Sequence, residues 1–225
     1  MGEEEKTTLE RIHEAAAAEF MEKGFQAASL RNIVKTAGVT TGAFYGYYGS
    51  KEELFRTLVG DVYEYFMNGY RESLSAFEAL PIEEQPEHMG HAGHDCMIRM
   101  LEYSYAHRDA CHLLLECSRG TRYEYMVDEM IELEVDSTRK YCEVLKKLGN
   151  EVPVIDKRLE HILVTGMMNA YFEIMIHDVP KEEVLHYVKE LNDFYTDNEP
   201  KSALARDLGD CRDNKGKLAK RVFTC

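Results

Sequence analysis

The sequence lacks the features that would place the chain in a membrane. No apolar run approaches the roughly 20 residues that a helix needs to cross a bilayer. The first ten residues, MGEEEKTTLE, are acidic and polar, unlike a secretory signal. We therefore expect a cytoplasmic protein with no membrane partner.

Proline and strand-like alternation are scarce too. Five prolines occur in 225 residues, and apolar residues recur at helical spacing along most of the chain. The sequence contains no G-x-S-x-G, P-loop, dinucleotide-binding or helical H-E-x-x-H signature. We therefore predict an all-α protein that is not an enzyme, with no catalytic residues and no cofactor.

Cysteine pairs with metal-ligand spacing are also absent. The six cysteines stand at positions 96, 111, 117, 142, 211 and 225, and none forms a C-x-x-C pair. The segment H-x-x-H-x-x-H-D-C brings His88, His91 and His94 together, and imidazole and thiolate suit zinc or copper. A helical metal or redox sensor using this His and Cys set is therefore the alternative function. Solvated loop histidines are the commoner outcome, so we predict no metal site.

The chain has no net positive charge; its formal net charge is −14. The acidic excess lies mostly beyond residue 58, where residues 59–225 hold 20 basic and 32 acidic residues. Residues 20–58 hold 5 basic and 3 acidic residues, a balance of +2. A local basic patch is enough for phosphate contact, so the overall charge does not exclude DNA binding.

The apolar periodicity and the end signals divide the chain into nine expected helices. Gly24 is a natural helix stop, Ser29 and Thr40 are N-cap residues, and Ser50-Lys51-Glu52-Glu53 resembles a capping box. A loop is expected at 81–93, where Pro, Glu and His gather. The expected helices cover residues 7–23, 30–37, 40–47, 51–77, 95–107, 110–117, 123–148, 155–177 and 181–195.

Two short helices joined by a tight turn at Gly38 form a helix-turn-helix candidate. The second helix of such a pair enters the DNA major groove. Phe44 and Tyr48 are placed as core anchors. The other residues of this helix are small or carry hydroxyls suited to DNA, and Lys51 adds a positive charge at the next helix start; the DNA-facing candidates are Thr40, Thr41, Gly42, Ala43, Tyr45, Tyr47 and Lys51.

Three segments carry a resemblance to a known family: A-x-x-x-F-x-x-x-G-F at 16–25, S-L-R-N-I-V-K-T-A-G-V at 29–39 and T-G-A-F-Y-G-Y-Y-G-S-K-E-E-L at 41–54. Together they resemble the DNA-binding domain of the tetracycline-repressor (TetR/AcrR) family of transcriptional regulators. The resemblance covers some 45 residues. It implies that Ser29 also faces DNA, with Thr40, Thr41, Gly42, Tyr45, Tyr47 and Lys51.

The resemblance also implies the architecture and the partners of the chain. We expect a three-helix helix-turn-helix domain at 1–50 and a helical ligand-binding and dimerisation domain at 51–196, followed by a disordered tail at 197–225. The expected protein is a homodimeric repressor that a small-molecule effector releases from double-stranded operator DNA. The helices at 155–177 and 181–195 are the expected dimer interface.

Tyrosine and methionine are frequent beyond residue 60 and make adaptable apolar pockets with polar handles. Carboxylates such as Glu116, Glu134 and Glu173 would favour a cationic aromatic ligand. Core packing is the commoner role of such residues. The ligand-binding candidates are Tyr63, Phe66, Tyr70, Tyr103, Glu116, Tyr123, Met167 and Tyr171.

Overall fold

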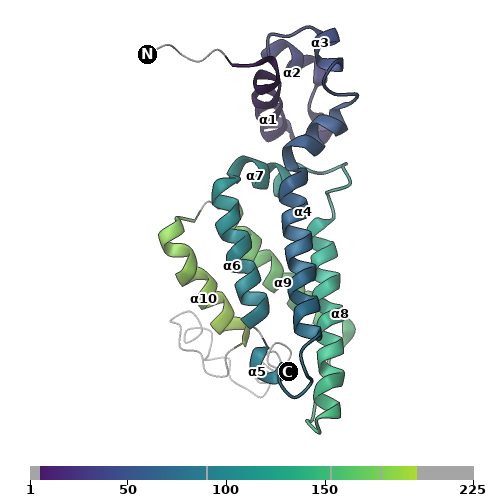
Figure 1. The fold of residues 1–225 in the computed structure, drawn as a ribbon, viewed down its shortest axis with the longest axis vertical. Coiled ribbons are helices and arrows are strands. Elements are labelled where there is room, and N and C mark those ends of the chain that lie inside the picture. The colour runs from purple at the N-terminus through teal and green to yellow at the C-terminus, as the bar shows by residue number, and fades with distance from the viewer. Residues whose placement is uncertain (1–5, 90, 153, 178, 197–225) are drawn as a thin grey trace. The chain divides into compact units, whose positions relative to one another are not determined.

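The computed structural model describes residues 6–89, 91–152, 154–177 and 179–196 (Figure 1). This part of the chain is helical and contains no strand, so the prediction of an all-α protein is confirmed. None of its helices is both long and apolar enough to cross a membrane. The helices are α1 (Thr8–Ala27), α2 (Leu30–Thr36), α3 (Thr41–Tyr45), α4 (Lys51–Glu78), α5 (Gln85–His88), α6 (His91–Ala106), α7 (Arg108–Glu116), α8 (Met126–Lys147), α9 (Lys157–Ile176) and α10 (Lys181–Thr196).

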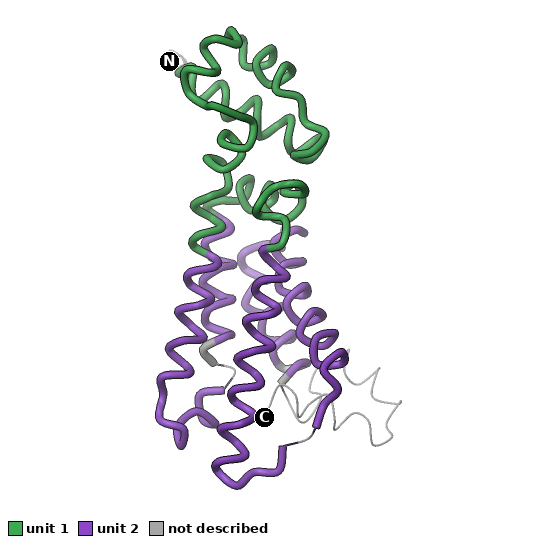
Figure 2. The backbone as a smooth tube through the Cα atoms, turned by 90° about the vertical axis from the view of Figure 1, so that its right-hand side faces the viewer, with its two compact units in different colours: residues 1–65, 106–125 green, residues 66–105, 126–225 purple. Residues whose placement is uncertain are grey.

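The chain divides into two compact units, and the division does not follow a single cut at residue 50 (Figure 2). Unit 1 comprises residues 1–65 and 106–125, and unit 2 comprises residues 66–105 and 126–225. Residues 106–125 join unit 1 because α7 packs against α1. The Phe25 N–H donates to the carbonyl of Cys117 at 2.9 Å, which fixes the end of α7 to the end of α1. The tail predicted at 197–225 lies outside the described residues.

Helix α1 begins with a capping box. The Thr7 hydroxyl accepts from the Glu10 N–H, and the Glu10 carboxylate accepts from the Thr7 N–H, so two free backbone donors are satisfied. Gly24 has φ +69° and bends the backbone, as its prediction as a helix stop suggested, but helical geometry resumes up to Ala27. Burial of the apolar face packs Phe20 edge-on against Phe55, with ring centroids 5.0 Å apart.

Two predicted caps turn out differently. Ser29 precedes α2, but its side chain makes no capping hydrogen bond, and its N–H instead donates to the Glu19 carboxylate at 2.9 Å. Ser29 is therefore the N-cap residue of α2 by position, as predicted, but its hydroxyl does not cap the helix. At the start of α4 the Ser50 hydroxyl accepts from the Glu53 N–H as expected. The return bond goes from Gly49, rather than Ser50, to the Glu53 carboxylate.

Unit 2 is a bundle built from the later part of α4 with α6, α8, α9 and α10. Helices α8 and α9 pack along each other, and Arg139 of α8 donates two hydrogen bonds to one carboxylate oxygen of Glu160 on α9. The loop predicted at 81–93 is partly wrong, because it contains α5 and the start of α6. Methionine is frequent in this core; the buried methionines are Met67, Met97, Met100, Met126, Met130, Met168 and Met175.

Candidate nucleic-acid interface

Helix α3 is short and is held at its start by a side chain. The Thr40 hydroxyl accepts from the Ala43 N–H at 3.0 Å, as the sequence predicted. Phe44 is fully buried and Tyr48 is 7% exposed, so one side of this segment is anchored in unit 1. The tight turn before it uses Gly38 at φ +64°, a conformation that side chains with a Cβ rarely adopt.

The opposite side of the α3 segment is exposed. Tyr45 and Tyr47 are 56% and 50% exposed, although tyrosine rings tend to be covered in a folded core. The remaining candidates of this segment, Thr40, Thr41, Gly42 and Ala43, are exposed as well. The structure therefore presents hydroxyls beside residues small enough to let a backbone approach closely. This is the residue chemistry that contacts base edges and phosphates.

Lys51, a predicted DNA-facing residue, has internal partners in this structure. Its Nζ donates to the carbonyls of Phe25 at 2.6 Å, Gln26 at 3.4 Å and Ala28 at 3.0 Å, and it lies 4.4 Å from the centre of the Phe25 ring. The ammonium has three donor hydrogens, and each has a carbonyl here. Lys51 thus fixes the turn between α1 and α2 from the start of α4. A phosphate contact of Lys51 stays a prediction, as does the DNA contact of Ser29, which is half-buried.

A second side-chain contact fixes the end of the α3 segment. Nε2 of His13, on α1, forms a short hydrogen bond with the Tyr48 hydroxyl. Burial lowers the pKa of His13 and raises the pKa of Tyr48, so both groups are uncharged at neutral pH. This neutral bond ties the segment after α3 to α1.

Two exposed basic residues of α2 were missed as individual candidates. Arg31 and Lys35 are both exposed, and the described part of the chain records no ion pair for either. In the sequence, the feature that indicated them was the net charge of +2 over residues 20–58, to which both contribute. They add positive charge to the same helix-turn-helix that exposes the α3 hydroxyls.

The predicted ligand-binding residues are divided between the two units. In unit 1, Tyr63 and Tyr123 are buried and pack edge to face, with ring centroids 5.0 Å apart. Glu116, also in unit 1, is exposed, and its carboxylate lies 2.7 Å from a ring nitrogen of His112. The unit 2 candidates are Phe66, Tyr70, Tyr103, Met167 and Tyr171. The structure therefore does not bring the eight residues together in one unit.

Tyr70 lies in a buried polar contact of unit 2. Its hydroxyl donates to Oε2 of Glu134 on α8 at 2.5 Å and lies 3.8 Å from the sulfur of Met168 on α9. Burial is the main cause that raises the pKa of the Glu134 carboxyl above its ordinary value of 4.5, and the bond from Tyr70 partly opposes it. Side chains of α8 and α9 thus both contact the hydroxyl of Tyr70 on α4.

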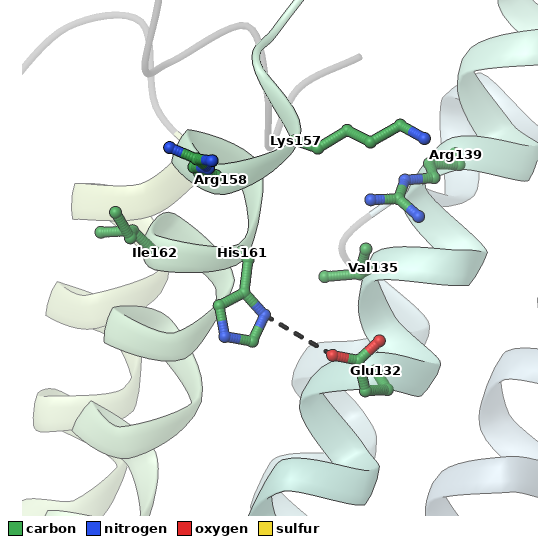
Figure 3. A pocket seen from close by; sticks show the side chains of 7 residues that line it. All are labelled: Glu132, Val135, Arg139, Lys157, Arg158, His161 and Ile162. Atoms are coloured by element: carbon green, nitrogen blue, oxygen red, sulfur yellow. Dashed lines mark ion pairs between the residues drawn. The ribbon is translucent and has the colours of Figure 1, made fainter.

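A basic hollow of about 370 Å³ lies between α8 and the first turns of α9 (Figure 3). No residue of it was among the predicted sites. Arg139 is bonded to Glu160, and His161 lies 3.7 Å from Glu132, so two of its basic groups already have acidic partners. The lining side chains are Glu132, Val135, Arg139, Lys157, Arg158, His161 and Ile162.

The metal or redox sensor alternative is not supported. Within the described residues no group of three or more His, Cys, Asp or Glu side chains is arranged to hold a metal ion. The side chain of His91 lies outside the described part of the structure. Burial raises the pKa of the Cys111 thiol to about 12 and also raises that of Cys117, which disfavours the reactive thiolate.

Comparison with known proteins agrees with the helix-turn-helix. Residues 12–58 match the family of bacterial regulatory proteins of the tetR type. The chain is 47% identical over 51 residues to the uncharacterized HTH-type transcriptional regulator YdgC of Bacillus subtilis, covering 23% of this chain and 26% of that protein. It is 35% identical over 80 residues to the HTH-type transcriptional regulator TtgR of Pseudomonas putida, covering 36% and 38%. The chain thus matches less than two fifths of the length of these relatives.

The likeness of the fold extends further than the likeness of the sequence. SCO3833 of Streptomyces coelicolor, a member of the TetR transcriptional regulator family, superimposes with a TM-score of 0.51 at 20% identity, covering 86% of this chain and 91% of that one. At this identity the comparison establishes the arrangement of helices alone. The sequence likeness lies where α1, α2, α3 and the start of α4 form the helix-turn-helix.

Proposed function

Because residues 12–58 form a DNA-binding domain of the tetR family of bacterial regulatory proteins, we propose that this chain is a transcriptional regulator that binds operator DNA through the α3 segment. The observation that carries the proposal is the exposed face of that segment, where Thr41, Tyr45 and Tyr47 face solvent while Phe44 is buried. This face gathers three hydroxyls on one short segment, and hydroxyls of this kind contact DNA phosphates and base edges.

The contacts divide by chemistry. The hydroxyls of Tyr45 and Tyr47, with the charges of Arg31 and Lys35, suit phosphates, which position the protein without reading sequence. Thr41 and Ala43 lie on the helix that enters the groove and suit base edges, where a small side chain meets a thymine methyl. Substituting the first group weakens binding to every sequence, and substituting Thr41 changes the preferred sequence.

The test begins with a duplex selected by the wild-type protein from a random-sequence library. The affinity of this duplex for Tyr45→Ala should fall about fivefold or more, as expected for the loss of one contact of ~1–3 kcal/mol. Tyr125→Ala is the matched control, because Tyr125 is 59% exposed and belongs to unit 1 but lies after α7. If fluorescence anisotropy gave both variants the wild-type affinity and salt dependence, α3 would not be the DNA-binding element.

We further propose that the regulator is a homodimer formed through α9 and α10. Ile162 of α9 and Leu185 of α10 are 63% and 62% exposed, and water contact of such side chains is unfavourable. Ile162→Glu and Leu185→Glu should shift the protein from dimer to monomer in sedimentation equilibrium. Val154→Glu is the control, since Val154 is 95% exposed but lies outside both helices. A wild-type protein that sediments only at 26.0 kDa would refute the dimer.

The effector is proposed to bind in unit 2 and to release the DNA, which makes the protein a ligand-responsive repressor. The methionine-rich core supports this proposal, because unbranched thioether side chains rearrange readily around a guest molecule. Linkage then requires that operator DNA and effector weaken each other's binding by the same factor. Effector titration of the protein with and without the selected duplex measures that factor from both directions.

A further inference from the structure

The hollow between α8 and α9 in unit 2 is basic, although the chain as a whole carries a formal net charge of −14. Its volume of about 370 Å³ is within the range of about 300–1,000 Å³ that is usual for small-molecule sites. Arg139, Lys157, Arg158 and His161 line it, and Glu132 is the one carboxylate among the lining side chains that the structure describes. The composition of the hollow is thus opposite to that of the average surface.

Two cations of different helices face each other across this hollow. Figure 3 shows the side chain of Lys157 extending from the first turn of α9 toward the guanidinium of Arg139 on α8. The ring of His161, one turn further along α9, points into the same space, and the buried side chain of Val135 lies on the α8 side. Like charges repel, so an anion between Lys157 and Arg139 would stabilise this arrangement.

Both cations keep hydrogen-bond donors for a ligand. Arg139 donates from Nε and one terminal nitrogen to a single oxygen of Glu160, at 2.9 and 2.7 Å, and a guanidinium has five N–H donors in a fixed plane. Glu160 is 8% exposed, so these bonds hold the guanidinium in a defined orientation. Lys157 is exposed and has no ion pair within the described residues. An anion in the hollow would therefore meet an oriented guanidinium and an ammonium whose donors are available.

Side chains, rather than the backbone at the start of α9, supply the positive charge. The two N–H groups that follow Asp156 by two and three positions already donate to its carboxylate, at 3.0 and 3.4 Å. Among the lining groups, three cations stand against two carboxylates that contact them, Glu132 and Glu160, which leaves a charge of +1. Protonation of His161 would make it +2. This balance suits a ligand with one or two negative charges.

We propose that this hollow binds a small organic oxyanion, a carboxylate or a phosphate monoester, between Lys157 and Arg139, with the apolar part of the ligand against Val135. The planar fork of a guanidinium suits two oxygens of either headgroup, and a lysine adds a mobile point charge. The hollow shares no residue with α3 or with the methionine-rich core proposed for the effector, so it is a second ligand site.

The test compares four ligands that carry one benzene ring each: benzoate, phenyl phosphate, the neutral benzyl alcohol and the cationic benzylamine. Equilibrium dialysis with the full chain is run at constant ionic strength, because salt screens exposed charges. At least one anion should bind with a Kd of about 1 mM or tighter, and at least about fivefold more tightly than benzyl alcohol and benzylamine. The tighter of the two anions then identifies the preferred headgroup.

Substitutions at Lys157 then locate the site. Lys157→Gln should weaken anion binding about threefold or more, and Lys157→Glu about tenfold or more, through loss and reversal of one charge. The matched controls are Lys147→Gln and Lys147→Glu, because Lys147 is exposed at the last residue of α8 but does not line the hollow. Both controls should stay within about twofold of the wild-type affinity. Arg139→Lys keeps the charge beside Glu160 but loses the fork, and should weaken binding in a protein that still unfolds cooperatively.

Three results would each overturn the proposal. They are failure of both anions to bind at about 10 mM, equally tight binding of benzyl alcohol, and equal losses in the Lys147 and Lys157 variants, which would indicate attraction to the overall charge rather than a site. Binding of the selected duplex by the wild-type protein is measured separately. A regulator that binds this duplex and no anion refutes the second site while leaving the proposed function intact.

Discussion

Lys51 in unit 1 and Glu134 in unit 2 are both half-buried ionisable side chains, and their hydrogen-bond partners differ. In unit 1 the ammonium of Lys51 donates to three backbone carbonyls and lies over the Phe25 ring. In unit 2 the carboxyl of Glu134 accepts one hydroxyl. The comparison teaches that an ammonium with a carbonyl for each of its hydrogens fixes a local structure, whereas burial of a carboxyl with one donor raises the pKa of that carboxyl.

The largest expected effect is at Lys51. Lys51→Met keeps the length of the side chain but removes the donors to three carbonyls, so the free energy of unfolding should fall by about 1.5–3 kcal/mol in urea titrations. Lys35→Met is the control, since Lys35 is exposed on α2, and the free energy of unfolding of this variant should differ little from that of the wild type. Unchanged stability of Lys51→Met with a salt slope of DNA binding reduced by about one would instead identify Lys51 as a phosphate contact.

Tyr70→Phe tests the hydrogen bond to the Glu134 carboxyl in unit 2. It removes the recorded hydrogen bond of the Glu134 carboxyl while the ring stays, and should destabilise the protein by about 1–3 kcal/mol. The pKa of Glu134 should rise further, because the bond from Tyr70 is what opposes the effect of burial. NMR titration of the carboxyl carbon follows that pKa directly. A pKa that stays the same would show that Tyr70 does not support the carboxyl.

A pair of glycines should respond with opposite signs. Gly24 in unit 1 has φ +69° and ψ 162°, a region adopted almost only by glycine, and no atom lies within 4 Å of the place that a Cβ would take, so Gly24→Ala costs only backbone strain, about 1–3 kcal/mol. Gly69 in unit 2 is helical with equally open space, so Gly69→Ala should stabilise by about 0.5–1 kcal/mol. Thermal unfolding of the two variants measures both. If Gly24→Ala stabilised the protein as Gly69→Ala should, the bend at Gly24 would not be required.

The smallest change in stability at a single pH is expected for Glu134→Gln, because glutamine keeps an acceptor for the Tyr70 hydroxyl. Its effect lies in the pH profile. The raised pKa means that the folded protein holds this proton more tightly than the unfolded chain does. The wild-type contribution is thus fully present below pH 4.5 and is lost as the pH rises through the raised pKa. The variant should lack that loss, and parallel wild-type and variant profiles would contradict the burial of the charge.

The elements that sequence predicts well are those with local causes. Helix starts at Thr40 and Ser50 and the turn at Gly38 follow from neighbours a few residues away. Phe44 and Tyr48 are buried as predicted. The α3 segment, the centre of the candidate site, was therefore predictable in its position and in its exposed residues. The DNA contacts themselves stay predictions.

Features that depend on distant residues were not predictable. The hydroxyl of Ser29 makes no capping bond, and its N–H donates to the carboxylate of Glu19, ten positions away. Lys51 has the charge that suits a phosphate contact, yet its ammonium donates to the backbone carbonyls of residues 25, 26 and 28. Glu116 and Glu134 look equivalent in the sequence, and only the folded chain shows that Glu134 is half-buried beside Tyr70 whereas Glu116 is exposed. A single sequence contains no signal for such contacts.

The bond from the Phe25 N–H to the Cys117 carbonyl has a consequence for protein engineering. The family match ends at residue 58, which suggests a convenient cut for a portable DNA-binding module. That cut would discard residues 106–125, leaving the Phe25 amide without its acceptor and the ring of Phe55 without Tyr123 beside it. A usable module would need α7 reconnected through a designed linker, because the natural module is assembled from two stretches of chain.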